Sequence, residues 1–419
     1  ADYNTAVGSL ALTADTLGSR TVAIGTGALA QQNFTTATDT YNVAVGFSAG
    51  TAVTTGIRNS IIGGLAGDAL TDADDNVAIG YAALTTDTMG SKSTAIGQGA
   101  LYTQNFVTAT DSYNTAVGYS AGTLITTGIQ NTFIGGLAGD VTTDADYNTA
   151  VGVGAMGTNI LGSRNTALGR NALTTQNPAT AVDMYNTAVG FGAGGAVTTG
   201  INNTFVGSYA GDDTNDGNNN TAIGMSALSG NCADANTAIG NSAAIACTGA
   251  DNTVVGYYAG GQLTSGSRNL ILGHESGSNL FSNGLFQVTT HDDRIVLGTT
   301  EATNAYIQVA WTVVSDERDK TEITDIPQGL NLVKELRPIS YKFRTSREDD
   351  TPKGATRYGF SAQEVLAIEG DNPVIVDNEQ EDKLKITTDS LVAVLTKAIQ
   401  ELSTQVDELK QELKTLKGE

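Results

Sequence analysis

The sequence predicts a mainly β chain: a long parallel β-solenoid of about 17-residue coils, followed by a small α/β domain that ends in a coiled-coil helix. Three observations predict this fold. A short motif recurs through the first 280 residues, the composition changes abruptly at Ser315, and the last thirty residues carry an apolar heptad pattern. We therefore divide the chain into a repeat region (1–280), a β neck (281–314), a globular domain (315–390) and a terminal helix (391–419).

The composition limits the possible partners. The chain of 419 residues has a net charge of −22, of which −15 lies before Ser315 and −7 from Ser315 onward. Such an acidic chain is not expected to bind nucleic acid or an anionic membrane. It has no run of 18 apolar residues, and its first residues lack the basic and apolar regions of a signal peptide, so we expect no membrane insertion.

The repeat is anchored on one Asn position, which Ser or Thr replaces twice. Successive positions lie 17, 21, 17 and 17 residues apart, which defines a 72-residue superunit, and two 16-residue steps follow near the end. The positions are Asn4, Thr21, Asn42, Asn59, Asn76, Ser93, Asn114, Asn131, Asn148, Asn165, Asn186, Asn203, Asn220, Asn236, Asn252 and Asn269. Sixteen similar units of this length are typical of a solenoid.

Each unit reads N-T-A-V/I-G, which predicts a strand of four to five residues closed by a Gly turn with positive φ. Stacked coils would form parallel sheets, and we expect the inner columns to contain Val7, Ile24, Val45, Ile62 and their successors. Small Ala and Gly side chains leave each coil thin, so we expect oligomerisation to add burial. The repeated Asn predicts an amide ladder that satisfies backbone groups of the turns.

Candidate binding sites within the repeats are weak. Four-residue insertions begin at Gln32, Gln104 and Gln176 and are either glycan contacts or, as we prefer, tolerant surface turns. The acidic turns TDADDN, TDADYN and GDDTNDGNNN match no calcium-loop pattern, and we interpret them as solvated turns. We predict no cofactor and no metal site.

Cysteine and histidine offer few further candidates. Cys232 and Cys247 occupy nearly equivalent places in adjacent coils, so they are either stacked free thiols or a disulfide, and we expect free thiols. His274 and His291 lack neighbours at metal-ligand spacing, so we assign them structural or surface roles.

The region after the repeats is predicted in three parts. DRIVLG at Asp293 and NAYIQVAWTVV at Asn304 predict the strands of the neck, with Trp311 packed between chains. LNLVKELRPISYKF predicts a short helix ended by Pro338 and then a strand through Ile339, Tyr341 and Phe343. RYGFSAQEVLAI predicts a Gly turn and a second helix.

The terminal helix has the clearest periodic signal in the chain. Apolar residues alternate by three and four over nearly four heptads, which predicts a coiled-coil seam. The seam consists of Val392, Leu395, Ile399, Leu402, Val406, Leu409, Leu413 and Leu416. Its β-branched residues at three of four a positions, with Leu at every d, favour two strands in an isolated coil.

These repeats resemble the N-x-x-x-G head repeats of trimeric adhesins and of many phage tail-fibre shafts, over residues 1–298. The resemblance implies a left-handed parallel β-roll in a three-chain bundle, although these 17-residue coils are longer than those of the adhesin heads. We give this trimeric architecture precedence over the two-stranded preference of the terminal seam.

The C-terminal region resembles the intramolecular chaperone domain that ends many phage tail spikes and fibres. The resemblance rests on S-D-x-R-x-K (Ser315, Asp316, Arg318, Lys320), LRPISYKF, GFSAQEV and SLVAVLTKAIQEL. It implies a trimerisation chaperone that aligns the β-roll and then severs itself from the fibre. Near-identical coils offer many almost equivalent registers, so such a device has a clear physical purpose.

The resemblance also implies a Ser–Lys dyad. Ser315 would attack the carbonyl of Val314, Lys320 in its neutral form would accept the proton, and Asp316 and Arg318 would support the site, so the scissile bond is Val314–Ser315. Asp319 departs from the family, which often has an apolar residue there. A carboxylate beside Lys320 keeps the amine protonated unless it points away.

The leading hypothesis is a viral tail fibre that is assembled in the host cytoplasm and incorporated into the virion. We expect a homotrimer that contacts a host cell-surface glycan or protein receptor and other virion tail proteins. The expected enzymatic activity is a single-turnover self-cleavage with no external substrate. The alternatives are a non-viral trimeric surface adhesin and a purely structural fibre that retains its C-terminal clamp.

Overall fold

The computed structural model describes residues 1–278, 285–302, 305, 308, 313–345, 347 and 349–418. They form two compact units, Ala1–Thr300 and Glu301–Glu419. Most of the second strand expected in the neck, NAYIQVAWTVV from Asn304, lies outside the described residues, and so does Trp311. The neck strand that is described, β23 (Ile295–Leu297), pairs with β22 (Leu270–Leu272) as the last strand of the first unit.

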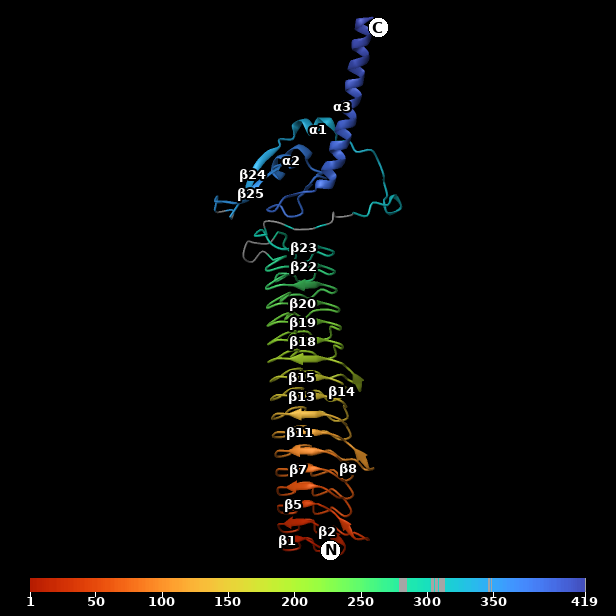
Figure 1. Ribbon diagram of the computed structural model, residues 1–419, viewed down its shortest axis with the longest axis vertical. Coiled ribbons are helices and arrows are strands. Elements are labelled where there is room, and N and C mark those ends of the chain that lie inside the picture. The colour runs from red at the N-terminus through yellow and green to blue at the C-terminus, as the bar shows by residue number, and fades with distance from the viewer. Residues whose placement is uncertain are drawn as a thin grey trace. The chain divides into compact units, whose positions relative to one another are not determined.

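The first unit is a solenoid in which every coil contributes one strand to a single 17-stranded parallel sheet (Figure 1). Strands are three residues long, shorter than predicted, because a glycine turn follows each one directly. The sheet contains, besides β22 and β23, β1 (Thr5–Val7), β3 (Val22–Ile24), β5 (Val43–Val45), β6 (Ser60–Ile62), β7 (Val77–Ile79), β9 (Thr94–Ile96), β11 (Thr115–Val117), β12 (Thr132–Ile134), β13 (Thr149–Val151), β15 (Thr166–Leu168), β17 (Thr187–Val189), β18 (Thr204–Val206), β19 (Thr221–Ile223), β20 (Thr237–Ile239) and β21 (Thr253–Val255). The predicted β-solenoid of about 17-residue coils is therefore confirmed.

The 21-residue coils add a second, local pairing. Their insertions form short parallel pairs with the preceding coil: β2 (Gly18–Ser19) with β4 (Thr38–Asp39), β8 (Gly90–Ser91) with β10 (Thr110–Asp111), and β14 (Gly162–Ser163) with β16 (Val182–Asp183). The extra residues are thus accommodated without changing the register of the main sheet.

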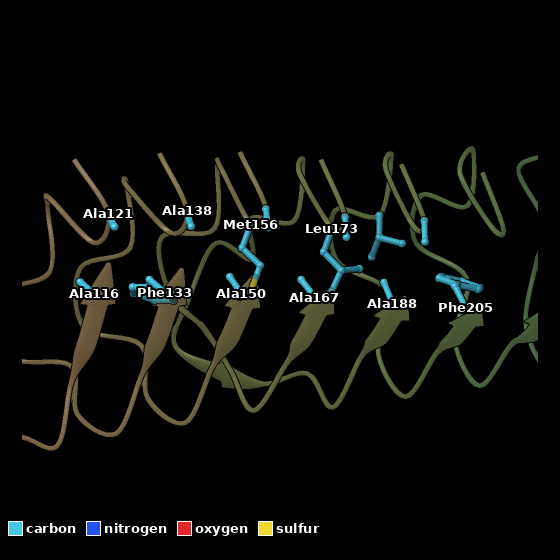
Figure 2. Packing of buried hydrophobic residues seen from close by; sticks show 14 of the residues in the cluster. Ala116, Ala121, Phe133, Ala138, Ala150, Met156, Ala167, Leu173, Ala188 and Phe205 are labelled. Atoms are coloured by element: carbon cyan, nitrogen blue, oxygen red, sulfur yellow. The ribbon is translucent and has the colours of Figure 1, made fainter. Parts of the chain in front are cut away.

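The inner columns predicted from the sequence were wrong by one residue. Val7, Ile24 and Ile62 point outward and are 57%, 37% and 41% exposed, whereas the middle residues of the strands, such as Ala23 and Ile61, are fully buried. Alternation places only every second residue inside, and the narrow coil accepts Ala there. Figure 2 shows this arrangement, with Ala116, Phe133 and Ala150 directed from successive strands toward the turns opposite.

The size of the buried side chain in the middle of the strand repeats with the 72-residue superunit and not with the single coil. The ring of Phe133 occupies space left by two glycines: a Cβ atom would lie 2.9 Å from the ring at Gly122 and 2.6 Å from it at Gly139. Ile61 and Phe205 occupy the same place four coils earlier and later. Large side chains thus alternate with gaps that fit them, as close packing requires.

The tight coils depend on left-handed backbone at several positions. In the coil that contains β12, φ is positive at Gln130, Gly135, Leu137 and Gly139, with values of 57°, 131°, 59° and 56°. Only the Gly turn was expected from the sequence. The strain at Leu137 is offset by stacking, because its N–H donates to the Tyr119 carbonyl of the preceding coil at 2.9 Å.

A buried amide ladder runs along the sheet, as predicted. Asn131 donates from Nδ2 to the Ala145 carbonyl at 2.8 Å, and its Oδ1 accepts from the Asn148 backbone N–H at 3.0 Å. The Asn131 backbone N–H in turn donates to Asn114 Oδ1 at 2.9 Å. Asn131 therefore satisfies buried backbone groups of Ala145 and Asn148.

At the first two insertions, a Gln completes the hydrogen bonds where Ser93 or Thr21 replaces the ladder Asn. Gln104, from the insertion, donates to Ser93 Oγ at 2.8 Å and to Asp87 Oδ2 at 2.6 Å, while its Oε1 accepts from Asn114 Nδ2 at 2.9 Å. Gln104 thus supplies the amide that Ser93 lacks. Gln32 has the same role beside Thr21.

The second unit contains all the α-helices that the structure describes. Its elements are the 3₁₀ helix η1 (Glu317–Asp319), α1 (Leu330–Glu335), β24 (Ile339–Arg344), β25 (Pro352–Gly359), α2 (Ala362–Glu369), β26 (Val376–Asp377), β27 (Lys385–Ile386) and α3 (Thr388–Lys417). Strand β24 pairs antiparallel with β25, and β26 with β27. The predicted helix, strand, second helix and terminal helix are confirmed.

A small core holds this unit together. It comprises Leu332, Val365, Ile375, Val376, Leu391 and Val394, from both short helices, the β26 segment and the first turns of α3. Two carboxylates fasten the backbone around it. Glu369 accepts from the N–H groups of Val374, Ile375 and Val376 at 2.8–2.9 Å, and Glu401 accepts from the Leu330 N–H at 2.7 Å, which ties α1 to α3.

Candidate self-cleavage site

The backbone around Ser315 forms one tight turn that returns Lys320 to it. Asp316 caps η1, because its Oδ1 accepts from the Arg318 N–H at 2.9 Å. The Lys320 N–H closes the turn on the Glu317 carbonyl at 3.1 Å. The capping carboxylate thus fixes the path between the two candidate catalytic residues.

The turn places the two predicted dyad residues in direct contact. Lys320 Nζ lies 2.7 Å from Ser315 Oγ and 3.3 Å from the Ser315 carbonyl oxygen. This is the separation that proton transfer between a nucleophile and its base requires. Ser315 and Lys320 are both exposed in the single chain, and Val314, whose carbonyl group belongs to the expected scissile bond, is 83% exposed.

The charges around the dyad are paired with one another. Arg318 binds Asp316 through two nitrogens, with Nε 3.0 Å from Oδ1 and Nη2 2.5 Å from Oδ2. This hydrogen-bonded pair lowers the pKa of Asp316 and raises the pKa of Arg318. The charge of Arg318 is therefore compensated by Asp316.

Asp319 was expected to interfere if its carboxylate approached Lys320. Among the ion pairs of the described residues, none joins Asp319 to Lys320. The Asp319 N–H instead donates to the Asp316 carbonyl at 3.2 Å within η1. The departure from the family motif thus leaves the Ser315–Lys320 contact intact.

The seam of α3 is exposed along its length. Leu391, Val394 and Ala398 of its first turns belong to the buried side, whereas the heptad residues face solvent. Their exposed fractions run from 37% at Leu395 to 84% at Leu416. A helix with this exposed stripe is typical of one that pairs with other helices.

The other candidate sites have structural explanations. Cys232 and Cys247 are free and buried, and burial raises the pKa of both thiols, to about 12 at Cys247. His274 stacks on Tyr257 at 5.2 Å between ring centroids. The described residues contain no group of three or more His, Cys, Asp or Glu placed to hold a metal ion. None of the described helices combines the length and the apolar character needed to cross a membrane.

Three functional features were missed from the sequence. The anchoring roles of Glu369 and Glu401 have no motif that would reveal them. The outward column of Val and Ile was visible as a pattern but assigned to the wrong face. The ladder Asn would have indicated the correct face. It lies two residues before the middle residue of each strand, so both side chains point inward.

Comparison with known families agrees with this geometry. Residues 315–375 match the family model described as chaperone of endosialidase, and the match begins at Ser315 itself. This confirms the resemblance of the C-terminal region to an intramolecular chaperone, and a β-solenoid followed by such a domain fits a tail fibre or tail spike. No curated protein and no solved structure matches the chain.

Proposed function

We propose that this chain is a viral tail fibre whose C-terminal domain acts as a trimerisation chaperone and then releases itself by cleaving the Val314–Ser315 bond. The observation that carries the proposal is the 2.7 Å contact between Ser315 Oγ and Lys320 Nζ at the first residue of the chaperone match. The match supports the chaperone role. The contact supports the chemistry of release.

The cleavage is an acyl transfer within one peptide bond. Ser315 Oγ attacks the Val314 carbonyl carbon while its proton passes to neutral Lys320 Nζ. The C–N bond breaks as Lys320 returns the proton to the Ser315 nitrogen, which leaves an ester between Val314 and Ser315 Oγ. Water then hydrolyses the ester, so the fibre ends in the Val314 carboxylate and the released domain begins with the Ser315 amine.

Assembly is the natural trigger for this reaction. A lysine amine becomes neutral near pH 7 when it is removed from water, yet Lys320 is exposed in the single chain. Neighbouring chains that cover the η1 turn would supply the missing burial. Cleavage then follows trimerisation, so the chaperone is not lost before it has acted.

Two exposed apolar stripes support a homotrimer. The third residue of every strand of the 17-stranded sheet, from Val7 to Leu297, is aliphatic and lies on the outer face of that sheet. Many of these residues are more than a third exposed. The seam of α3 is a second stripe in the other unit. Contiguous exposed apolar surface of this extent marks an interaction site, and identical chains in register would cover both stripes.

The proposed location is the virion, after assembly in the host cytoplasm, with other tail proteins and a host cell-surface glycan or protein receptor as partners. The exposed insertion loops, which carry Val107 at 77% exposure, are the candidate contacts with a receptor. A non-viral surface adhesin and a structural fibre with a permanent clamp are the alternatives, and the latter is tested by cleavage.

The test is to express the chain beside a Ser315→Ala variant and measure intact masses under denaturing conditions. The proposal predicts two fragments that meet at Val314–Ser315 for the wild type and one whole chain for the variant. A Lys320→Arg variant, which keeps the charge but not a usable base, is also expected to stay whole. If wild type and variants all stay whole while forming trimers, the domain is a permanent clamp and the dyad assignment fails.

A further inference from the structure

Each insertion forms a small ledge on the side of the solenoid. The ledges are the three short strand pairs β2 with β4, β8 with β10, and β14 with β16, which project from the stack at three heights (Figure 1). They recur every 72 residues, so successive ledges lie four coils, or about 19 Å, apart along the stack. The ledges are therefore equivalent places on the surface, one in each superunit.

Three exposed side chains meet at the middle ledge. Lys92 Nζ lies 2.5 Å from Asp111 Oδ2 and 5.1 Å from the centroid of the Tyr113 ring. The Tyr113 hydroxyl lies 3.4 Å from the same Asp111 oxygen and 3.2 Å from Lys92 Nζ. The hydrogen bond to Asp111 raises the pKa of Lys92 to about 12, so the amine stays charged at neutral pH. A cation, a carboxylate and an aromatic ring thus form one cluster.

The first and third ledges repeat this cluster with Arg as the cation. We call each cluster a ledge trio. The trios are Arg20, Asp39 and Tyr41; Lys92, Asp111 and Tyr113; and Arg164, Asp183 and Tyr185. In the first and third trios, the cation lies 3.0 and 2.8 Å from the carboxylate, and its guanidinium carbon lies 5.8 and 5.9 Å from the centroid of the ring. The charged pair and the ring therefore lie together at every ledge.

One face of each tyrosine ring is available to a ligand. Between 50% and 53% of each of the three tyrosines is exposed. The cation of the trio comes from the coil before the ring, whereas the coil after it has Arg58, Gln130 or Asn202 at the position of the tyrosine. Arg58 turns to Asp75, with Nε 2.5 Å from Oδ1, and the other two residues carry neither a charge nor a ring.

The trio is retained although buried residues beside it change. A cation, an Asp and a Tyr recur at the same three positions in all three superunits. The buried neighbours that change are Thr40, Ser112 and Met184, between the carboxylate and the ring, and Thr21, Ser93 and Asn165, after the cation. Exposed residues that only tolerate solvent vary more freely than buried ones, so retention at the surface indicates a ligand.

We infer that each ledge trio binds one sugar ring of a neutral glycan chain that runs along the solenoid. The inference rests on the receptor contact of the proposed function and gives that receptor a chemical class. The C–H face of a pyranose packs on the open face of the tyrosine, because the face of an aromatic ring is negative. The hydroxyl groups of the sugar donate to the carboxylate and accept from the cation.

Charge favours a neutral glycan over an acidic one. Within each trio the carboxylate compensates the cation, and the residues before Ser315 carry a net charge of −15. This surface repels an acidic polysaccharide. Three equivalent subsites also let one polymer bind several ledges at once, which raises its affinity above that of a single trio. Each tyrosine precedes the third strand residue of its coil by four positions, so the trios lie outside the aliphatic stripe.

Binding of the full-length chain to immobilised polysaccharides tests this inference. The probes are three neutral polymers, dextran, mannan and galactan, and one acidic polymer, hyaluronan, measured by biolayer interferometry. We expect binding to at least one neutral polymer and none to hyaluronan. Absence of binding to all three neutral polymers overturns the inference, and so does preferential binding to hyaluronan.

Substitution of the tyrosines locates the binding surface. Asn202 and Asn219 occupy the tyrosine position in later coils with φ of 59°, so Asn fits the left-handed backbone there. We expect Tyr113→Asn to raise the dissociation constant about tenfold, and simultaneous Tyr→Asn changes in all three trios to raise it at least about a hundredfold.

The matched control lies in the same coil as Tyr113. Tyr119 is 59% exposed and follows strand β11, whereas Tyr113 precedes it. Tyr119→Ser introduces the residue that the chain has at Ser208, the equivalent position, and should leave the dissociation constant unchanged. Equal losses in Tyr119→Ser and Tyr113→Asn would contradict the assignment of the site to the trios.

The cation separates a binding role from a stabilising one. Lys92→Arg introduces the cation of the other two trios and should bind like the wild type. Lys92→Gln introduces the residue found at Gln130, one of the equivalent positions, and should weaken binding about fivefold. If Lys92→Gln lowers the melting temperature but leaves the dissociation constant unchanged, the trio only stabilises the stack and the inference fails.

Failure of this inference is distinguishable from failure of the proposed function. A chain that cleaves at Val314–Ser315 and forms trimers, but binds no neutral polymer, overturns the glycan site alone and leaves a protein receptor. A chain that stays whole and monomeric overturns the proposed fibre, whatever polymer it binds.

Discussion

The solenoid and the C-terminal domain are ordered by different kinds of contact. In the solenoid, Asn131 makes bonds to its neighbours that most of the other ladder Asn residues repeat, so one coil is nearly equivalent to the next. In the C-terminal domain, Leu332, Val365 and Ile375 meet in a core that occurs once. Repeated contacts stabilise the stack of coils, but they do not distinguish one coil from another when two chains are aligned. Non-repeating contacts supply that information, which explains why one chain would carry both.

The largest effect is expected from the backbone of the solenoid. Gly135 has φ of 131°, and a Cβ atom there would lie 2.7 Å from the Gly152 carbonyl. Gly135→Ala should therefore cost at least about 3 kcal/mol in the free energy of unfolding, measured by urea titration with far-UV circular dichroism.

The adjacent glycine is the matched control. A Cβ atom at Gly136 meets nothing within 4 Å, so Gly136→Ala should leave the urea midpoint nearly unchanged. Equal losses in the two variants would show that stacking does not constrain the coils as described.

The second-largest effect is expected from a change in the amide ladder. Asn131→Ala leaves the buried Asn148 N–H and the Ala145 carbonyl without partners, at about 1–3 kcal/mol for each group. Thermal unfolding should show this loss, whereas Asn177→Ala at an exposed turn should not. If Asn131→Ala and Asn177→Ala have the same melting temperature, the hydrogen bonds of the ladder contribute nothing beyond its packing.

The C-terminal domain is expected to respond at its carboxylate anchor. Glu369→Gln replaces one acceptor oxygen opposite the Val374–Val376 amides by a donor, which should cost about 1–2 kcal/mol. The helical circular dichroism signal reports this unit, because the described α-helices belong to it. Glu364→Gln, at the exposed pair with Arg337, should change the signal far less. A larger loss of the helical signal in Glu364→Gln than in Glu369→Gln would mean that Glu369 does not anchor this unit.

The smallest effect concerns pH. Partial burial raises the pKa of Asp140. Gly157 stands where Thr85 donates to the equivalent Asp68, so Asp140 has no hydroxyl donor at that place. A raised folded-state pKa means that the carboxyl favours folding when protonated and opposes it once ionised. Asp140→Asn should therefore stabilise the solenoid slightly at pH 7 and have no effect near pH 3. A constant difference across this range would contradict the assignment.

Much of the fold followed from the sequence because the repeat is strict. The spacing of the Asn positions predicted the coil length, the parallel register and the amide ladder. The inner face was predicted wrongly because Val and Ala are both apolar, and hydrophobicity alone does not say which one a narrow coil buries. Leu137 and the other non-glycine residues with positive φ were invisible, since stacking overrides local preference there.

The candidate site was only partly predictable. The motif from Ser315 to Lys320 identified the pair through its resemblance to a family, but the contact depends on the Asp316 cap and one 3₁₀ turn. The pairing of Arg318 with Asp316 was not foreseen, because two charges on one turn can face either each other or a neighbour. Glu369 and Glu401 act through distant backbone, which no local pattern encodes.

Refolding tests the central claim most directly. Purified, self-cleaved fibre and uncleaved Ser315→Ala chain would be unfolded in denaturant, diluted under identical conditions and measured by light scattering. If the C-terminal domain aligns the solenoids, the uncleaved chain recovers trimers, while the cleaved fibre yields monomers, aggregates or staggered assemblies. Equal recovery of in-register trimers from both would contradict the claim.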